Sequence, residues 1–118
     1  MKNSEVTFLK IKWFPNEGNE RLLNELCYGL EEEGIIYEIE EAKTDTEKQS
    51  DSAVAYYCAV SSKFGIGVYI SHKGNIIVHY KKLEIDDPYL DIKPCSDEEI
   101  REIGGNIGRL LKGQPLRV

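Results

Sequence analysis

The sequence predicts a single α/β domain over residues 1–118, built as a three-layer α/β/α sandwich. Its sheet is expected to hold four to five strands, mostly parallel, with one antiparallel hairpin strand. Segments with strand character alternate with segments of helical period in the order β-α-β-α-β-β-α, and a helix between two strands implies a right-handed crossover to a parallel neighbour. A chain of 118 residues, 41% of them hydrophobic, buries one core and not two.

The first strand is expected at residues 6–14, VTFLKIKWF, where apolar and polar side chains alternate. The loop PNEGN follows and supplies Asn19 as the N-cap of the first helix. Apolar side chains then recur on one stripe at the helical period, and Gly34 is placed to end the helix. The members of this stripe are Leu22, Leu23, Leu26, Cys27 and Leu30.

A second strand, a short helix and a hairpin make up the middle of the chain. The strand is expected at residues 35–41, and a polar, turn-rich loop follows it. Residues 53–62 predict a helix with a stripe of Val54, Tyr57, Cys58 and Ser61. Strands at 64–71 and 75–81 then form a hairpin around HKG, in which Gly74 can take a positive φ.

The last helix has the strongest local signals. Residues 84–95 show no clear period and add at most a short edge strand. Ser96 opens a capping box with Glu99, and the helix ends at Gly113. Apolar side chains follow the box at helical spacing: Ile100, Ile103, Ile107, Leu110 and Leu111. The resulting architecture is expected to be flavodoxin-like or anticodon-binding-domain-like.

Charge and composition exclude several classes of partner. A net charge of −6 and a pI near 5.0 argue against nucleic acid or an acidic membrane, because phosphate binding needs a basic face. No apolar run is long enough to span a membrane and no signal peptide is evident, so a cytoplasmic location is expected. Three cysteines, odd in number and widely spaced, fit neither a disulfide framework nor a zinc site.

The sequence shows no catalytic constellation. The two histidines, His72 and His79, lie in the hairpin, and the sequence places no serine or cysteine nucleophile beside them. The FGIG segment lacks the spacing of a phosphate-binding loop, so its glycines more simply allow a helix to pack closely. Asn16 and Glu17 follow the first strand, where open α/β sheets bind ligands, but two polar residues are weak evidence.

The run GLEEEG places Glu31, Glu32 and Glu33 at a helix C-terminus, where the helix dipole disfavours negative charge. The last helix carries three glycines, which cost about 1 kcal/mol each in a helix interior and therefore suggest close backbone contact. A helical projection puts Tyr28, Gly29 and Glu32 opposite the apolar stripe, as a docking face, while Glu33 lies nearer the core. The alternative is an ordinary solvated charge run.

Four motifs carry a resemblance to a known family: GLEEEGI, SSKFGIGVYI, VHYKKL followed by PYL, and GNIGRLLKGQPL. In this order, and over nearly the whole chain, they resemble the small (β) subunit of diol and glycerol dehydratase reactivases. A weaker form of the pattern belongs to the medium subunit of the cobalamin-dependent dehydratases themselves. Those chains are typically much longer, so the length of this one favours the reactivase.

The resemblance implies a non-catalytic, chaperone-like subunit. In this family a large subunit with an actin-like ATPase domain carries the nucleotide, and a heterotetramer of two large and two small subunits is expected. The small subunit mimics the medium subunit of the dehydratase and so docks on the inactivated enzyme, from which damaged cobalamin then leaves. The location implied is the cytoplasm, in association with a bacterial microcompartment.

The resemblance also implies site residues. Glu32 is expected to reach a magnesium or calcium ion shared with the large subunit, and the isolated chain is expected to hold no cofactor. The partner interface is expected to comprise Tyr28, Gly29, Glu31, Glu32, Asn106 and Arg109, with the last two pointing away from the core or sideways toward a partner. Two other classes stay open: a medium subunit of a dehydratase, and an unrelated flavodoxin-like ligand-binding domain.

Overall fold

The computed structural model describes residues 8–43 and 48–113. Among these residues, five strands and three helices follow the predicted alternation, with a further strand before the last helix. The strands are β1 (Leu9–Trp13), β2 (Tyr37–Glu41), β3 (Ile66–Ile70), β4 (Ile76–Tyr80) and β5 (Leu90–Ile92). The helices are α1 (Glu17–Glu32), α2 (Asp51–Val60) and α3 (Asp97–Leu111).

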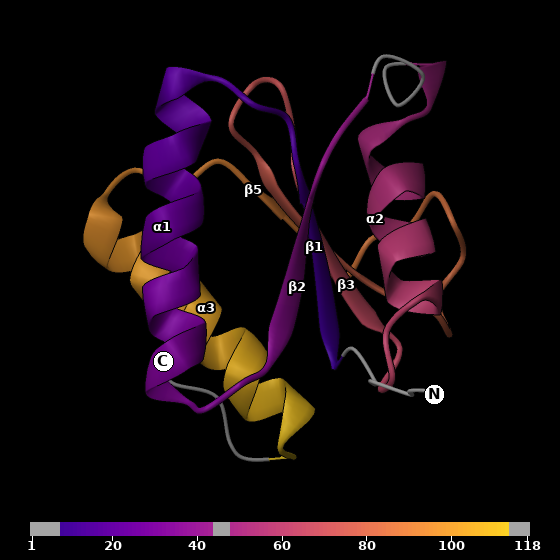
Figure 1. The fold of residues 1–118 in the computed structure, drawn as a ribbon. Helices are drawn as coiled ribbons and strands as arrows, with labels where there is room; N and C mark the ends of the chain where they lie inside the picture. The colour runs from indigo at the N-terminus through magenta and orange to yellow at the C-terminus, as the bar shows by residue number, and fades with distance from the viewer. Residues whose placement is uncertain (1–7, 44–47, 114–118) are drawn as a thin grey trace, which may run out of the picture.

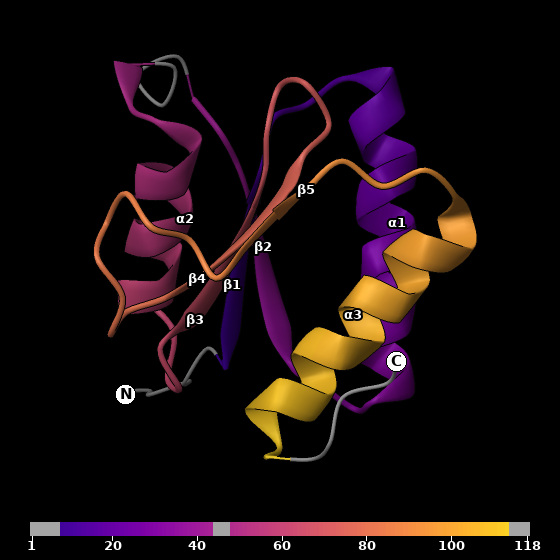
Figure 2. The same cartoon turned by 180° about the vertical axis from the view of Figure 1, so that it is seen from behind.

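The sheet has the strand order β2-β1-β3-β4-β5. Strand β1 pairs in parallel with both β2 and β3, whereas β4 is antiparallel to both β3 and β5. Four strands therefore run one way and β4 runs the other. Helices α1 and α3 cover one face and α2 covers the opposite face (Figure 1), and the view from behind shows the same three layers (Figure 2). The predicted three-layer α/β/α sandwich is confirmed, and residues 84–95 do add an edge strand.

The main core lies between the sheet and the pair α1 and α3. One face of β1, β3 and β4 meets the apolar stripe of α1, whose five predicted members are all buried. Helix α3 contributes Ile100 and Ile107, and Ile103, Leu110 and Leu111 pack partly buried against the same core. The periodicity in the sequence thus placed both helices correctly against the sheet.

A smaller core lies on the other face, where α2 packs on the sheet. It contains Val54, Ala55, Tyr69 and Ile77. Gly67 of β3 permits this approach, because a Cβ there would stand 2.2 Å from the backbone nitrogen of Ala59. The expectation that the FGIG segment lets a helix pack closely is therefore confirmed for Gly67.

Several predicted boundaries were wrong by a few residues. The N-cap of α1 is Asn16, whose side-chain oxygen accepts the backbone N–H of Asn19 at 2.8 Å. Asn19 is instead buried inside the first turn. Helix α2 begins two residues early because Ser50 caps it, and Tyr57 on its expected buried stripe is 53% exposed. Strand β1 starts at Leu9, and the first two residues of the expected strand lie outside the described residues.

Candidate functional site

Helices α1 and α3 lie side by side in a constant register. Arg21 donates to Asp97, and Arg101 donates to Glu25 at 2.6 Å, both pairs being separated by 76 residues in the chain. One helical turn beyond Glu25 and Arg101, Gly29 of α1 faces Gly105 of α3, and these two residues are also 76 positions apart. A Cβ on Gly29 would stand 2.8 Å from the Gly105 nitrogen.

The register continues to the C-terminus of α1, where Glu33 meets Arg109 at 3.4 Å. Along each helix these paired residues are four positions apart, so they lie on the one side of the helix that contacts the other helix.

Glycine residues allow the two helix backbones to lie in contact. A Cβ on Gly104 would stand 2.3 Å from the Leu26 carbonyl oxygen, and one on Gly108 would stand 2.7 Å from Glu33 Cβ. The close backbone contact expected from the helix glycines is confirmed, except that a Cβ on Gly105 would meet nothing within 4 Å.

Glu33, the last carboxylate of the acidic run, is neutralised within the chain. Its side chain is only 9% exposed and lies 2.9 Å from Lys112 Nζ as well as near Arg109. Lys112 also donates to the Glu33 backbone carbonyl at 3.0 Å, which places a cation at the C-terminus of α1, where the dipole favours one. Gly34 follows with a φ of 71°, as expected for a glycine that ends a helix.

Glu31, the first carboxylate of the run, also has a partner. The Tyr37 hydroxyl donates to Glu31 Oε2 at 2.5 Å. Burial, with a further contribution from this hydrogen bond, raises the pKa of Tyr37 well above its ordinary value. Two of the three carboxylates that the helix dipole disfavours, Glu31 and Glu33, therefore have partners within the chain.

Glu32 differs from its two neighbours. It is exposed, and among the described residues no hydrogen bond or ion pair reaches its carboxylate. It borders an open hollow of about 430 Å³ between the outer sides of α1 and α3. The hollow is lined by Glu32, Glu33, Glu98, Arg101, Glu102 and Gly105. Glu32 is thus the carboxylate of the run that remains available to a partner.

Tyr28 lies on the same outer side as Glu32 and is 51% exposed. The guanidinium carbon of Arg101 stands 5.8 Å from its ring centroid. The hydrogen bond to Glu25 raises the pKa of Arg101, to which the nearby charge of Glu32 also contributes. The outer face therefore joins an aromatic ring, one cation and several carboxylates from two helices.

The structure corrects one placement on this face. Gly29 is buried against the Arg101 carbonyl of α3 and does not lie on the outer side; the projection of a single helix misplaced it because it did not include the second helix. The Arg109 side chain turns sideways toward Glu33 of its own chain and is 25% exposed, and its place in the partner interface stays a prediction. Asn106 is half-buried beside an apolar hollow on the sheet side of α3.

Three residues of this face were missed from the sequence: Glu98, Arg101 and Glu102. Their spacing of three and four residues on α3 is the signal that places them on one side of that helix. The sequence does not show that this side adjoins Glu32, because the contact joins segments far apart in the chain.

The chain offers metal ligands at this face but not a complete set. Among residues 8–43 and 48–113, no three His, Cys, Asp or Glu side chains are grouped so that they could hold a metal ion. Carboxylate oxygens are the ligands that magnesium and calcium prefer. The free carboxylate of Glu32 therefore fits the role of one ligand, provided that the others come from elsewhere.

The other candidate groups have structural roles. His79 is buried, with its Nδ1 accepting the Tyr80 backbone N–H at 2.9 Å and its Nε2 lying 3.1 Å from the Ile85 carbonyl oxygen. Burial raises the pKa of the Cys27 thiol and raises that of Cys58 to about 11, so both thiols stay protonated and unreactive near neutral pH.

At the carboxyl ends of β1 and β3, where open α/β folds bind ligands, polar side chains are engaged within the chain. The Asn19 side-chain amide donates to the carbonyls of Phe14 at 2.7 Å and Ser71 at 2.9 Å, which ties the end of β1 to the end of β3. Asn16 is used as a helix cap.

In the described part of the chain, no helix combines the length and apolar character that crossing a bilayer requires.

Comparisons with known proteins agree with this arrangement. The family model described as "Dehydratase medium subunit" matches residues 10–117. The propanediol dehydratase-reactivating factor small subunit of Citrobacter freundii is 30% identical over 115 residues, which cover 97% of this chain and 95% of the relative. The diol dehydratase-reactivating factor small subunit of Klebsiella michiganensis is 30% identical over 102 residues, covering 86% and 78%.

Solved structures show the same fold. A glycerol dehydratase reactivase chain superposes with a TM-score of 0.83 at 27% identity, covering 95% of this chain and 97% of the other. A chain of the diol dehydratase-reactivating factor complexed with ADP and Mg²⁺ gives a TM-score of 0.80 at 26% identity, with coverage of 98% and 100%. The matches favour the reactivase small subunit over both alternatives. The chain belongs to the dehydratase medium subunit family and, within it, to the small subunits of dehydratase-reactivating factors.

Proposed function

We propose that this chain is the non-catalytic small subunit of a chaperone-like diol or glycerol dehydratase reactivase. In this role it docks on an inactivated cobalamin-dependent dehydratase, and damaged cobalamin is then released. The ATPase activity belongs to a large partner subunit, with two large and two small subunits in the assembly. The location proposed is the cytoplasm, in association with a bacterial microcompartment.

One observation carries the docking mechanism. The family model described as a dehydratase medium subunit spans residues 10–117, while the relatives covering the chain are named as reactivating factor small subunits. A subunit with the fold of the dehydratase's own medium subunit can compete for the same surface of the enzyme. Such competition needs shape and surface chemistry and no reaction, which agrees with the structural roles of His79 and the buried thiols.

The outer face of α1 and α3 is the surface that we assign to the large subunit. Tyr28 supplies exposed aromatic area and Glu32 supplies a carboxylate without an ion-pair partner among the described residues. We propose that Glu32 is one ligand of a magnesium or calcium ion whose remaining ligands belong to the large subunit. A divalent cation there would also offset repulsion between Glu32 and the neighbouring Glu98 and Glu102.

A reactivation assay tests this function. Inactivated diol or glycerol dehydratase is incubated with ATP, magnesium, intact cobalamin and the large reactivase subunit, with or without this chain. Recovery of dehydratase activity is expected only when both subunits are present. Recovery with the large subunit alone, or no formation of a complex between this chain and the large subunit, would contradict the proposal.

A further inference from the structure

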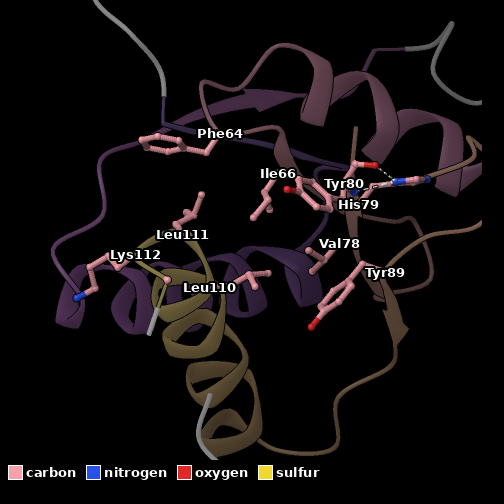
Figure 3. A pocket seen from close by; sticks show the side chains of 10 residues that line it. Phe64, Ile66, Val78, His79, Tyr80, Tyr89, Leu110, Leu111 and Lys112 are labelled. Carbon is pink, nitrogen blue, oxygen red and sulfur yellow. Dashed lines mark hydrogen bonds between the residues drawn. The ribbon is translucent and has the colours of Figure 1, made fainter. Parts of the chain in front are cut away.

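An apolar groove lies on the far side of α3 from the acidic face. It is a hollow of about 470 Å³ between the C-terminal turns of α3 and the ends of β3 and β4 (Figure 3). The groove is lined by Phe64, Ile66, Val78, His79, Tyr80, Tyr89, Leu110, Leu111, Lys112 and Gly113. Ile66 begins β3 and Tyr80 ends the antiparallel β4, so the groove is at the opposite end of the sheet from the Asn19 hydrogen bonds.

The groove is both accessible and elongated. Phe64 and Tyr89 are 49% and 50% exposed, although aromatic side chains are normally buried where the fold can cover them. A second hollow of about 230 Å³ continues along α3 and shares Val78, Tyr89 and Leu110 with the first. The two hollows together form a channel along the helix, which suits an extended or helical segment better than a compact small molecule.

Basic side chains border the groove, although the chain as a whole is acidic. Lys63 Nζ lies 5.4 Å from the ring centroid of Phe64, and Lys82 Nζ lies 5.8 Å from that of Tyr80. Among the described residues, neither lysine pairs with a carboxylate. The backbone of segment 84–87 is bound to the opposite layer, where Ser52 of α2 donates to the Ile85 carbonyl. An apolar groove with a lysine rim is complementary to apolar side chains flanked by carboxylates.

We propose that this groove binds a segment of a protein partner in which apolar anchor residues are flanked by aspartate or glutamate. The anchors would contact Phe64, Tyr89 and Leu110, while the flanking carboxylates would pair with Lys63 and Lys82. Both lysines stand over aromatic rings, which keep their ammonium groups beside the groove. This surface is separate from the Glu32 face, so the complex would use two sides of α3.

Titration of the full-length chain with two synthetic peptides, followed by amide NMR, tests the proposal. One peptide carries leucine and phenylalanine at helical spacing flanked by glutamates, and the other has lysine in place of every glutamate. Saturable shifts at Phe64, Tyr89 and Leu110 are expected with the acidic peptide. At least about tenfold weaker binding is expected for the basic peptide and for the double variant Lys63→Glu, Lys82→Glu, with Lys73→Glu as the matched control.

Four outcomes would overturn the proposal. Equal binding of the two peptides, or acidic-peptide shifts confined to other surfaces, would remove the charge argument. Groove signals that shift on dilution of the free chain would identify a second copy as the occupant. Groove signals that shift on Leu116→Ser without peptide would identify the chain's own C-terminal segment. These titrations involve neither the large subunit nor a Glu32 variant. A negative result therefore contradicts the groove proposal and leaves the proposed function untouched.

Discussion

Gly29 of α1 and Gly105 of α3 face each other so closely that a Cβ on Gly29 would stand 2.8 Å from the Gly105 nitrogen and 2.2 Å from the Arg101 carbonyl oxygen. Only glycine permits this approach of two helix backbones. The contact fixes the register of the two helices, and that register brings Glu32 of α1 beside Glu98, Arg101 and Glu102 of α3. The candidate partner face therefore depends on a buried glycine.

Replacement of Gly29 by alanine should destabilise the chain. The new methyl group would overlap backbone atoms that cannot rotate away, and such overpacking costs about 1–3 kcal/mol. This cost exceeds the gain of at most about 1 kcal/mol in helix propensity. Gly105→Ala is the matched control, since a Cβ there meets nothing within 4 Å, and it should raise the free energy of unfolding. Urea unfolding of both variants measures the difference, and equal destabilisation would contradict the asymmetry.

Replacement of Ile107 by alanine should lower the free energy of unfolding by about 2–5 kcal/mol, because the lost side chain leaves a cavity. Ile107 is 4% exposed in the core between α3 and the sheet. Ile36→Ala is the control, because Ile36 is 61% exposed and its loss should change stability by no more than about 0.5 kcal/mol. Thermal unfolding followed by circular dichroism compares them. An unchanged melting temperature for Ile107→Ala would mean that the register of α3 is wrong.

Replacement of Glu32 by glutamine should weaken binding to the large reactivase subunit and leave folding intact. The change removes a negative charge from a helix C-terminus, so the melting temperature of the free chain should stay equal or rise slightly. Loss of the proposed ligand should lower affinity for the large subunit and reduce its dependence on magnesium. Calorimetry with added magnesium and with a chelator measures both effects.

Glu31→Gln is the control for Glu32→Gln, since its carboxylate already accepts from Tyr37. Glu31→Gln should keep the magnesium dependence of the unmodified chain. If the two variants bound the large subunit equally well with magnesium and with chelator, Glu32 would be an ordinary solvated side chain and the shared metal site would be wrong.

Stability should decline as the pH rises above about 10, with Tyr37 contributing to the decline. Burial and the hydrogen bond to Glu31 raise the pKa of Tyr37 above its ordinary value of 10.0. Above that pH the unfolded chain releases the phenol proton while the folded chain keeps it, so the contribution of Tyr37 to stability is complete below pH 10 and falls above it. Tyrosinate absorbance should include a late-ionising component from Tyr37, and this component should ionise earlier in Glu31→Gln. A titration curve that Glu31→Gln leaves unchanged would refute the role of this hydrogen bond.

The sequence by itself determined the order of the elements other than β5, and which faces of α1 and α3 meet the sheet. The stripe from Leu22 to Leu30 and the stripe from Ile100 to Leu111 repeat at the helical period, which is a local property of each segment. The Ser96 N-cap and the glycine turn at Gly74 are likewise local, and both are present. The Glu99 carboxylate accepts from the Cys95 N–H, one residue before the position that a capping box predicts. The motifs also sufficed for the family, because they occur in order along nearly the whole chain.

Only the tertiary structure decided which side chains pair with the acidic run. The helical projection already separated the outward Glu32 from Glu33, but it did not show that Tyr37 donates to Glu31 or that Arg109 and Lys112 pair with Glu33. The partners of Glu33, Arg109 and Lys112, lie on or just after α3, and Lys112 is 79 residues further along the chain. Gly29 is buried by the same remote helix, α3. A projection of one helix contains no information about the helix beside it, because long-range packing depends on the register that opposing backbones and charges adopt once the chain has folded.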